Sequence, residues 1–453
     1  MPLSHITELR LTAFKSFKDA ALPVDDVTLL TGRNSVGKSN ALDGLEVLAR
    51  LAEGDDLADA LDGRRREGGM VRGGSRGCVP HGSDAFSLGC TVSDGSEEFR
   101  FDVTVQVEPD LRIIAESLSG PAQTEKNRVK RAAQIYETQA PTASAAGISV
   151  QVFNGKRGVS PAREYRDSRL VLSQLPLSLT GKNVAERAVL HAATTVTLAL
   201  RGIFHLDPVP HLMREFVPAR DTDLRRTGEN LSAALRNLQS QDPQAFHAVV
   251  ELTRQVADDR ITDITFATSS LNDVMLQLEE SRGDSPQNSE EKTPAREMSD
   301  GLLRFLGIAT ALKSSRESLD IDVDGAAEMN DAAENGGVLM VLEELENGLH
   351  PSQASRVLDL VRDSYQSTGT RVLATTHSPA LLDAAEGSLN ESIIVCHRDP
   401  DSGLSRLTRL TDLPGYAKAL AEGTLGSAVT AGKLVDDVIE QPDYSDFRRF
   451  LGV

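Results

Sequence analysis

The chain of 453 residues has a formal net charge of −19, 40% apolar residues and no tryptophan, so it can bury a core across roughly two or three ordinary domains. This acidity argues against a protein that binds nucleic acid over its whole surface, but it leaves room for a local basic groove. No apolar run reaches the roughly 18 residues of a membrane span, the N-terminus lacks a signal-peptide pattern, and the three cysteines have no ligand-like spacing, so we expect a cytoplasmic protein.

Two β-strands are predicted near the N-terminus, over residues 5–14 and 22–30, with a turn at Lys15-Ser16-Phe17 between them. Both segments are rich in β-prone apolar side chains, and the second leads directly into a glycine-containing loop. Phe14 and Phe17 beside the turn are expected to pack into the core.

The stretch VTLLTGRNSVGKSN, from Val27 to Asn40, carries the most specific motif of the chain. It matches the phosphate-binding loop pattern G-x-x-x-x-G-K-S at every defined position, and a helix predicted over 40–52 follows it. The glycines let backbone N–H groups surround a phosphate, the lysine reaches the β/γ oxygens, and the serine hydroxyl binds Mg²⁺. We therefore predict an ATP and Mg²⁺ site, rather than a turn that matches by chance, at Gly32, Arg33, Asn34, Ser35, Val36, Gly37, Lys38, Ser39 and Asn40.

A loop rich in glycine and arginine follows the first helix, over residues 63–77. Its arginines either form a solvated charged face or contact phosphate groups, which suit the guanidinium fork: Arg64, Arg65, Arg66, Arg72 and Arg76. Alternating segments between residues 85 and 160 then predict an antiparallel sheet. A short basic cluster within them is expected to be exposed: Lys126, Arg128, Lys130 and Arg131.

Two helical regions and two strands are predicted for the middle of the chain, over 184–203, 231–256, 261–269 and 273–281. His205 and His211 lie between the helical regions without a carboxylate or cysteine partner at ligand spacing, so a metal site there is disfavoured. The absence of long heptad repeats predicts that any coiled-coil arm is short.

Two polar, acidic segments, 281–294 and 318–337, are typical of mobile insertions. The second contains DIDVDG, which matches part of a calcium loop but lacks the remaining ligands, so we assign no metal to it.

Between these insertions, Met298 to Phe305 reads MSDGLLRF and leads into a helix that ends near residue 312. Ser299 and the backbone of Gly301 would lie at the helix N-terminus, where free N–H groups and the helix dipole favour an anion. Taken alone, the same residues would be an ordinary helix N-cap.

Val338 to Leu342 are five apolar residues that predict a buried parallel strand, and Glu343 and Glu344 follow it directly. Because open α/β sheets bind ligands at the carboxyl ends of their strands, both carboxylates are candidates for a catalytic site. A further strand over 371–375 places His377 just beyond its own carboxyl end.

The C-terminal region predicts a hairpin around Asp401-Ser402-Gly403, followed by helices. Asp399 and Asp401 match the DxD pattern of Toprim nucleases. Too few residues follow for a Toprim domain, so we interpret the two aspartates as turn residues.

Four motifs occur in a fixed order: AFKSF with GKSN, then SDG, then the paired acids with ENGLHP, then TTHSP. This set resembles the SMC/RecF/OLD-like branch of ABC-type ATPases, as a stand-alone AAA-type core without a Toprim domain. The resemblance implies an α/β fold, an ABC-type P-loop NTPase head with a mixed central sheet, an antiparallel β lobe and a helical insertion. We predict an N-terminal lobe over 1–180, a helical or short-arm insertion over 181–294 and a C-terminal lobe over 295–453.

The same resemblance assigns roles to the acids and the histidine. Glu343 would help Ser39 hold Mg²⁺, Glu344 would polarise the attacking water, and His377 would contact the γ-phosphate as Lys38 does. Glu343 replaces the more usual aspartate, which departs from the pattern of the family.

The resemblance also implies that Ser299 and Gly301 bind the γ-phosphate held by an opposite subunit. Leu345, after the paired acids, replaces the usual proline. The expected catalytic groups are therefore divided between two copies of the chain.

We expect an ATPase that forms a homodimer around ATP and acts in DNA repair or phage defence, with possible DNA contacts and a separate nuclease or other effector. The alternative is a nucleotide-gated scaffold or sensor with little turnover and no direct DNA contact. A third class, the ATPase subunit of a membrane transporter, is disfavoured because AFKSF and ENGLHP do not resemble transporter subunits.

Overall fold

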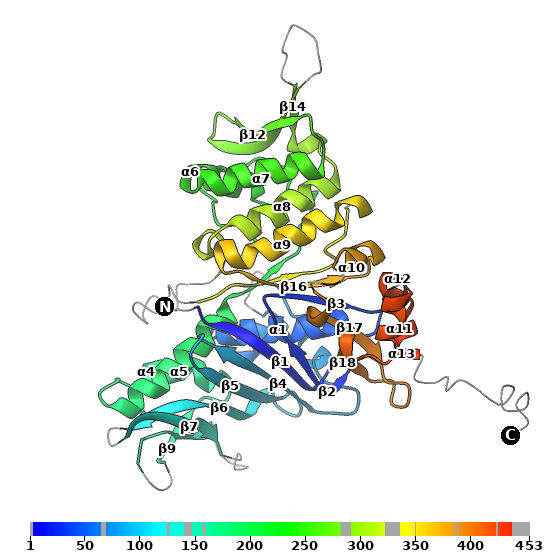
Figure 1. The fold of residues 1–453 in the computed structure, drawn as a ribbon. Helices are drawn as coiled ribbons and strands as arrows, with labels where there is room; N and C mark the ends of the chain where they lie inside the picture. The colour runs from blue at the N-terminus through cyan, green and yellow to red at the C-terminus, as the bar shows by residue number, and fades with distance from the viewer. Residues whose placement is uncertain are drawn as a thin grey trace, which may run out of the picture.

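The computed structural model describes residues 3–64, 69–124, 127–139, 147–156, 160–281, 291–321, 336–348, 350–385, 387, 389–422 and 425–436. Across these residues, one sheet of 14 strands has the order β10-β15-β16-β3-β17-β18-β2-β1-β4-β5-β6-β7-β8-β9. The strands from β10 to β17 pair in parallel, and those from β2 through β1 and β4 to β9 pair antiparallel. The predicted class, a P-loop NTPase head with a mixed sheet and an antiparallel β lobe, is confirmed (Figure 1).

The strands of this sheet, in sheet order, are β10 (Ile203–Leu206), β15 (Leu339–Leu342), β16 (Arg371–Thr376), β3 (Val27–Thr31), β17 (Ile393–Arg398), β18 (Ser405–Arg409), β2 (Phe17–Pro23), β1 (His5–Phe14), β4 (Ala85–Ser93), β5 (Glu98–Gln106), β6 (Arg112–Thr124), β7 (Asn127–Thr138), β8 (Ile148–Val152) and β9 (Ala162–Tyr165). The α-helices are α1 (Lys38–Ala52), α2 (Leu57–Asp62), α3 (Gly74–Gly77), α4 (Val171–Ser178), α5 (Val184–Arg201), α6 (Leu231–Gln241), α7 (Pro243–Val256), α8 (Asp300–Lys313), α9 (Ala354–Thr368), α10 (Pro379–Ala385), α11 (Tyr416–Ala421), α12 (Leu425–Ala431) and α13 (Lys433–Asp436).

Successive side chains of the parallel strands face two different cores, as a strand buried on both faces requires. Leu339 and Val341 of β15 join one apolar cluster, whereas Met340 and Leu342 join the other. Residues of α1 and α5 complete the first cluster, and residues of α8 and α9 complete the second (Figure 1). The strands that carry the predicted motifs are therefore fixed between two layers of helices.

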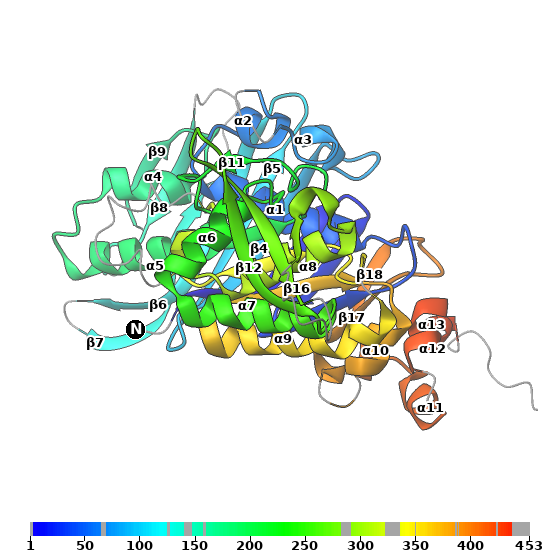
Figure 2. The same cartoon turned by 90° about the horizontal axis from the view of Figure 1, so that it is seen from above.

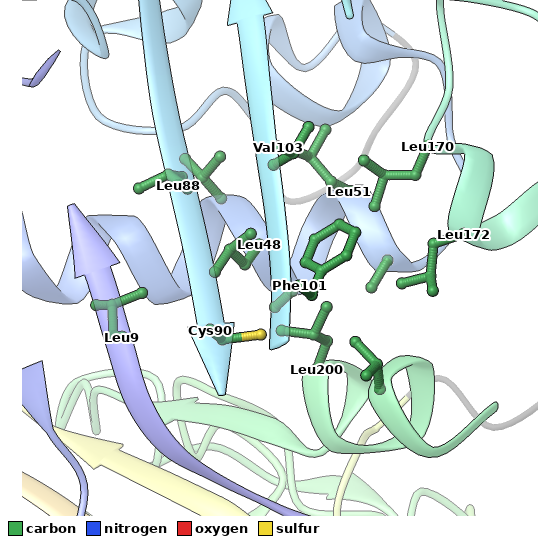
Figure 3. Packing of buried hydrophobic residues seen from close by; sticks show 14 of the residues in the cluster. Leu9, Leu48, Leu51, Leu88, Cys90, Phe101, Val103, Leu170, Leu172 and Leu200 are labelled. Carbon is green, nitrogen blue, oxygen red and sulfur yellow. The ribbon is translucent and has the colours of Figure 1, made fainter. Parts of the chain in front are cut away.

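The first core extends from the parallel strands into the antiparallel lobe. Figure 3 shows Leu48 and Leu51 of α1 packed among Leu88 of β4, Phe101 of β5 and Leu200 of α5. Each such fully buried side chain contributes about 1.5–3 kcal/mol to folding by leaving water. The helix that follows the phosphate-binding loop is thus anchored to the lobe as well as to the sheet.

A second, smaller sheet is antiparallel and lies beyond α8 and α9, away from the β lobe (Figures 1 and 2). It consists of β11 (Val217–Pro218), β13 (Asp273–Glu280), β12 (Ile261–Thr268) and β14 (Glu291–Pro294), and α6 and α7 pack against it. No helix in the described ranges has both the length and the apolar character needed to cross a membrane.

The segment predicted as one strand over 22–30 is two strands, which corrects the sequence prediction. β2 ends at Pro23 and β3 begins at Val27, and β18 and β17 lie between them in the sheet. Pro23 lacks an N–H for a continued ladder, and Thr28 Oγ1 accepts a hydrogen bond from the Asp25 N–H at 2.9 Å, which stabilises the turn. The chain therefore leaves the sheet after β2 and re-enters it with two strands between β2 and β3.

The three predicted regions remain a prediction. From the segment 181–294, α5 covers the antiparallel lobe and β10 forms the edge of the large sheet. The residues from 217 onward in that segment build the small sheet with α6 and α7. The parts of the predicted insertions at 282–290 and 322–335, including most of DIDVDG, lie outside the described residues, as do Arg65, Arg66 and Lys126.

Candidate nucleotide-binding site

The phosphate-binding loop connects β3 to α1, and its two glycines have backbone angles that disfavour other residues. Gly32 has φ 140° and Gly37 has φ 122°. A Cβ on Gly32 would lie 2.1 Å from the Cys396 carbonyl oxygen, and one on Gly37 would lie 2.5 Å from Ser405 Oγ. These glycines are therefore required by contacts with β17 and β18, in addition to any approach of a phosphate.

Side chains from distant parts of the sequence hold the loop in place. Arg398 donates to the Ser35 carbonyl at 3.0 Å. Asn40 donates to Ser16 Oγ at 2.8 Å, and Ser405 Oγ donates to the same oxygen at 2.7 Å. The AFKSF turn thus supports the loop directly. Arg398 and Ser405 carry no local sequence signal for this role, because their contacts depend on the pairing of β17 and β18 beside β3.

Lys38 folds back onto the loop in this structure. Its Nζ donates to the Gly32 carbonyl at 2.9 Å and to the Arg33 carbonyl at 3.0 Å. Burial lowers the pKa of Lys38, although Cys396 and the carboxylates Glu344 and Glu346 act in the opposite direction. These weak acceptors would be exchanged for phosphate oxygens when a nucleotide binds, because a charged ammonium favours an anionic partner.

The two residues predicted to hold Mg²⁺ lie in contact. Ser39 Oγ donates to Glu343 Oε2 at 3.2 Å, although the residues are 304 positions apart. A hydroxyl and a carboxylate are the hard oxygen donors that Mg²⁺ prefers, so this pair fits the ion. Glu343 also lies 3.5 Å from Arg72, which is itself 3.0 Å from Asp43. Arg72, from the arginine-rich loop, thus lies beside the Ser39–Glu343 pair, and its side chain remains about half exposed.

Glu344 follows Glu343 in a strained backbone position, with φ 51°. Its N–H donates to Thr375 Oγ1 at 2.8 Å, and the Asn347 side-chain amide donates to its Oε2. Positive φ is uncommon for residues other than glycine and is often found at functional sites. The turn 343–347 thereby directs two consecutive carboxylates toward one cavity.

His377 lies at the end of β16, as predicted. Its N–H donates to the Glu346 carboxylate at 2.5 Å. Burial and then the charge of Lys38 lower the pKa of His377, which favours a neutral imidazole with one ring N–H to donate. The sequence marks Glu346 and Asn347 only as parts of ENGLHP. In the structure, Glu346 contacts the His377 backbone, and Asn347 lines the same hollow as the histidine.

A cavity of about 360 Å³ brings most of these groups together. Its walls include residues from the phosphate-binding loop, the arginine-rich loop, the paired acids and the end of β16. The lining residues are Asn34, Ser35, Gly37, Lys38, Ser39, Asn40, Arg72, Glu343, Glu344, Thr375 and His377. A larger hollow of about 830 Å³ adjoins it and is lined by Gly32, Arg33, Val36, Glu346 and Asn347, among others. Three of the four motifs therefore converge.

The remaining motif, SDG at residues 299–301, lies elsewhere. Ser299 is exposed and caps α8, with its Oγ accepting from the Leu302 N–H at 3.3 Å. Gly301 packs so tightly on Gly348 that a Cβ there would lie 2.0 Å from the Gly348 carbonyl oxygen. Neither Ser299 nor Gly301 lines the two cavities beside the loop. The exposed α8 N-terminus is thus packed, through Gly301, against the turn that carries the paired acids.

The remaining candidates have structural roles. His205 is buried and its Nε2 lies 3.3 Å from Glu46, and no group of metal-ligating side chains forms around it among the described residues. Asp399 accepts from the Ser402 N–H at 2.9 Å and pairs with Arg406 at 2.6 Å, so it serves the β17–β18 turn. The His205 contact joins β10 to α1, and the Asp399 contacts stabilise the turn between β17 and β18.

A phosphate-binding loop, paired acids at the end of a parallel strand and a histidine on the next strand, set in this mixed sheet, define an ABC/SMC-type AAA ATPase core. The chain belongs to the family described as "AAA domain, putative AbiEii toxin, Type IV TA system", whose sequence profile matches residues 27–139 and 201–383. No curated protein sequence matches the chain.

Solved SMC heads are similar to this chain. The Smc head bound to the C-winged helix domain of ScpA has 13% identity and a TM-score of 0.45, covering 89% of this chain and 97% of that one. The SMC head domain from Thermotoga maritima has 12% identity and a TM-score of 0.38, covering 89% and 98%. The Smc head of Pyrococcus furiosus, bound to the C-terminal domain of ScpA, has 11% identity and a TM-score of 0.43, covering 93% and 99%.

Proposed function

We propose that the protein hydrolyses Mg²⁺-bound ATP at a site shared by two copies of the chain arranged head to tail. One observation carries the proposal. Lys38, the Ser39–Glu343 pair, Glu344 and His377 are assembled around one cavity, while the exposed N-terminus of α8 lies outside it. In a two-fold dimer, each copy can present the N-terminus of its α8 to the nucleotide bound by the other copy.

The residues of one copy suit the chemistry of phosphoryl transfer. Lys38 moves from the loop carbonyls to the β/γ oxygens, and Glu344 accepts the proton of the attacking water as its oxygen attacks the γ-phosphorus. His377 donates a hydrogen bond to the γ-phosphate. When bound, Mg²⁺ supplies positive charge that offsets the charge developing on the phosphate oxygens.

The second copy contributes Ser299 and the first N–H groups of α8 to the same γ-phosphate. The products are ADP and inorganic phosphate, so hydrolysis removes the group that joins the copies. Loss of that bridge would loosen the dimer, as in other nucleotide-dependent assemblies. ATP would thus control whether two copies are held together.

A Glu344→Gln variant tests this function, because it keeps the shape of the site and removes the general base. We expect a stable ATP-dependent dimer by light scattering and at least a hundredfold loss of turnover. Glu391→Gln, an exposed change away from the site, is the matched control and should behave as wild type. If ATP neither dimerises Glu344→Gln nor remains unhydrolysed on it, the proposal is wrong.

For the cellular role, we propose that the protein acts in DNA repair or phage defence with a separate effector such as a nuclease, in the cytoplasm. The RecF/OLD-like order of the motifs supports this role. ATP turnover measured with and without duplex DNA tests it, since a DNA-responsive enzyme should be stimulated at low salt and less so at high salt. Negligible turnover under both conditions would favour the nucleotide-gated scaffold instead.

A further inference from the structure

A second group of potential metal ligands lies in the antiparallel lobe, on elements that the nucleotide site does not use. Asp94 and Glu97 belong to the tight turn that connects β4 to β5, and His191 lies on α5. One ligand atom from each residue lies within 4.8 Å of the others. The turn and the helix are about 100 positions apart in sequence, so only the fold brings the three side chains together.

The distances match the edges of a metal coordination polyhedron. His191 Nε2 lies 3.6 Å from Asp94 Oδ2 and 3.5 Å from Glu97 Oε2. Tetrahedral ligands at the usual Zn–N and Zn–O lengths are separated by about 3.4 Å. Both separations exceed the usual length of a hydrogen bond between nitrogen and oxygen. These two separations, with all three ligand atoms within 4.8 Å of one another, are compatible with coordination of one divalent ion.

The carboxylates are positioned before any ion arrives. Asp94 Oδ1 accepts from the Ser96 N–H, the Ser96 hydroxyl and the Glu97 N–H at 2.8–2.9 Å, which leaves Oδ2 free to face the histidine. Glu97 Oε1 pairs with Lys130 at 2.5 Å. One oxygen of each carboxylate, Asp94 Oδ1 or Glu97 Oε1, is therefore already paired. The other oxygen, Asp94 Oδ2 or Glu97 Oε2, lies near His191 Nε2.

One carboxylate oxygen of this group is buried and unsatisfied. Glu97 Oε2 is buried without a hydrogen-bond partner, in a side chain that is only 11% exposed. A buried carboxylate oxygen is costly unless a cation or donor compensates it. His191 packs edge-on against Phe99, with ring centroids 5.8 Å apart, and this contact holds its Nε2 toward the carboxylates. The half-exposed histidine leaves a side open for a water ligand.

We propose that Asp94, Glu97 and His191 bind a first-row divalent metal ion such as Zn²⁺, with water completing the coordination. One imidazole and two carboxylates are a donor set that such ions accept, and the two carboxylates balance the charge of the ion. The ion joins the β4–β5 turn to α5, and so fixes the helix that covers the antiparallel lobe. This site is separate from the Mg²⁺ site at Ser39 and Glu343.

Zn²⁺ binding to the full chain tests the proposal. After treatment with a chelator, nucleotide-free protein is titrated with Zn²⁺ by equilibrium dialysis, in a Glu343→Gln background that weakens metal binding at the nucleotide site. We expect one tightly bound equivalent, and at least a tenfold weaker affinity in His191→Gln and in Glu97→Gln. His247→Gln, an exposed histidine on α7, is the matched control and should retain the affinity of its parent.

Spectroscopy and melting complete the test. Co²⁺ in place of Zn²⁺ should give visible d–d absorption that is lost in His191→Gln. Zn²⁺ should raise the melting temperature of the parent and of the His247→Gln control, but not that of His191→Gln or Glu97→Gln. Melting in chelator shows whether each variant is folded. Absence of a Zn²⁺ equivalent in the parent, or an unchanged affinity in folded His191→Gln, would refute the site.

Discussion

At the scale of single residues, the phosphate-binding loop is shaped by the strands beside it before any nucleotide is present. Gly32 and Gly37 have positive φ, and each faces an atom of β17 or β18. The Lys38 ammonium donates hydrogen bonds to two loop carbonyls, and a bound phosphate would replace these carbonyls as its acceptor. The geometry needed for ATP is therefore stabilised by contacts within the protein.

Gly32→Ala should abolish ATP binding and destabilise the fold. The new Cβ would lie 2.1 Å from the Cys396 carbonyl oxygen, so β17 must shift away from the loop. Gly82→Ala is a matched control because Gly82 also has positive φ, at 83°, but has no atom within 4 Å of the added Cβ. The control should cost only about 1–2 kcal/mol of backbone strain by urea denaturation and should bind ATP normally. Equal losses in both variants would show that strain, not the contact with β17, matters at Gly32.

At the scale of elements, α1 contacts the edge strand β10 and the segment between β11 and α6. Glu46 of α1 contacts Arg50, Arg226 and His205. Arg201 at the end of α5 donates to the carbonyls of Ala52 and Glu53 at the end of α1. The helix that begins at the nucleotide site is thus connected to β10, to the segment that carries Arg226 and to α5.

The His205 contact predicts a dependence of stability on pH. Burial lowers the pKa of His205 to about 4, which outweighs the opposing effect of Glu46. The unfolded chain, with its ordinary histidine pKa of about 6.5, then binds more protons than the folded one between these values. The free energy of unfolding should therefore fall as the pH is lowered from 6.5 to 4. Urea denaturation should show a smaller fall in His205→Gln than in wild type, whereas exposed His81→Gln should match wild type; identical slopes in His205→Gln would contradict the assignment.

The contact between α8 and the turn after β15 predicts a specific effect on turnover. Gly301→Ala would place a Cβ 2.0 Å from the Gly348 carbonyl oxygen, so α8 or the turn with Glu344 must move. We expect at least a tenfold loss of ATPase activity, with nucleotide binding to the monomer within about threefold of wild type, because a displaced catalytic group costs rate more than binding. Gly307→Ala on the same helix meets the flexible end of Met213 at 3.2 Å and Pro208 at an ordinary contact distance of 3.5 Å, and should retain activity. An active Gly301→Ala enzyme would show that this packing has no bearing on catalysis.

At the scale of the whole molecule, local patterns predicted the site better than they predicted its surroundings. The loop, the strand before the paired acids and the α8 cap each follow from a few adjacent residues, so the sequence could identify them. The separation of β2 from β3, the support from Arg398 and Ser405, and the position of Arg72 depend on pairing between distant strands. The grouping of Asp94 with His191 has the same origin. A single sequence carries no local signal for such contacts.

The division of the catalytic groups between two faces of the molecule is the central claim. It is tested most directly by mixing two variants that are each inactive: Lys38→Ala, which lacks the loop cation, and Ser299→Arg, which blocks the exposed end of α8. A mixed dimer has one intact site, built from the loop of the Ser299→Arg copy and the α8 end of the Lys38→Ala copy. Statistical pairing then predicts that the 1:1 mixture recovers about a quarter of the wild-type ATPase rate. A mixture as inactive as its components, or a Ser299→Arg variant as active as wild type alone, would contradict the account.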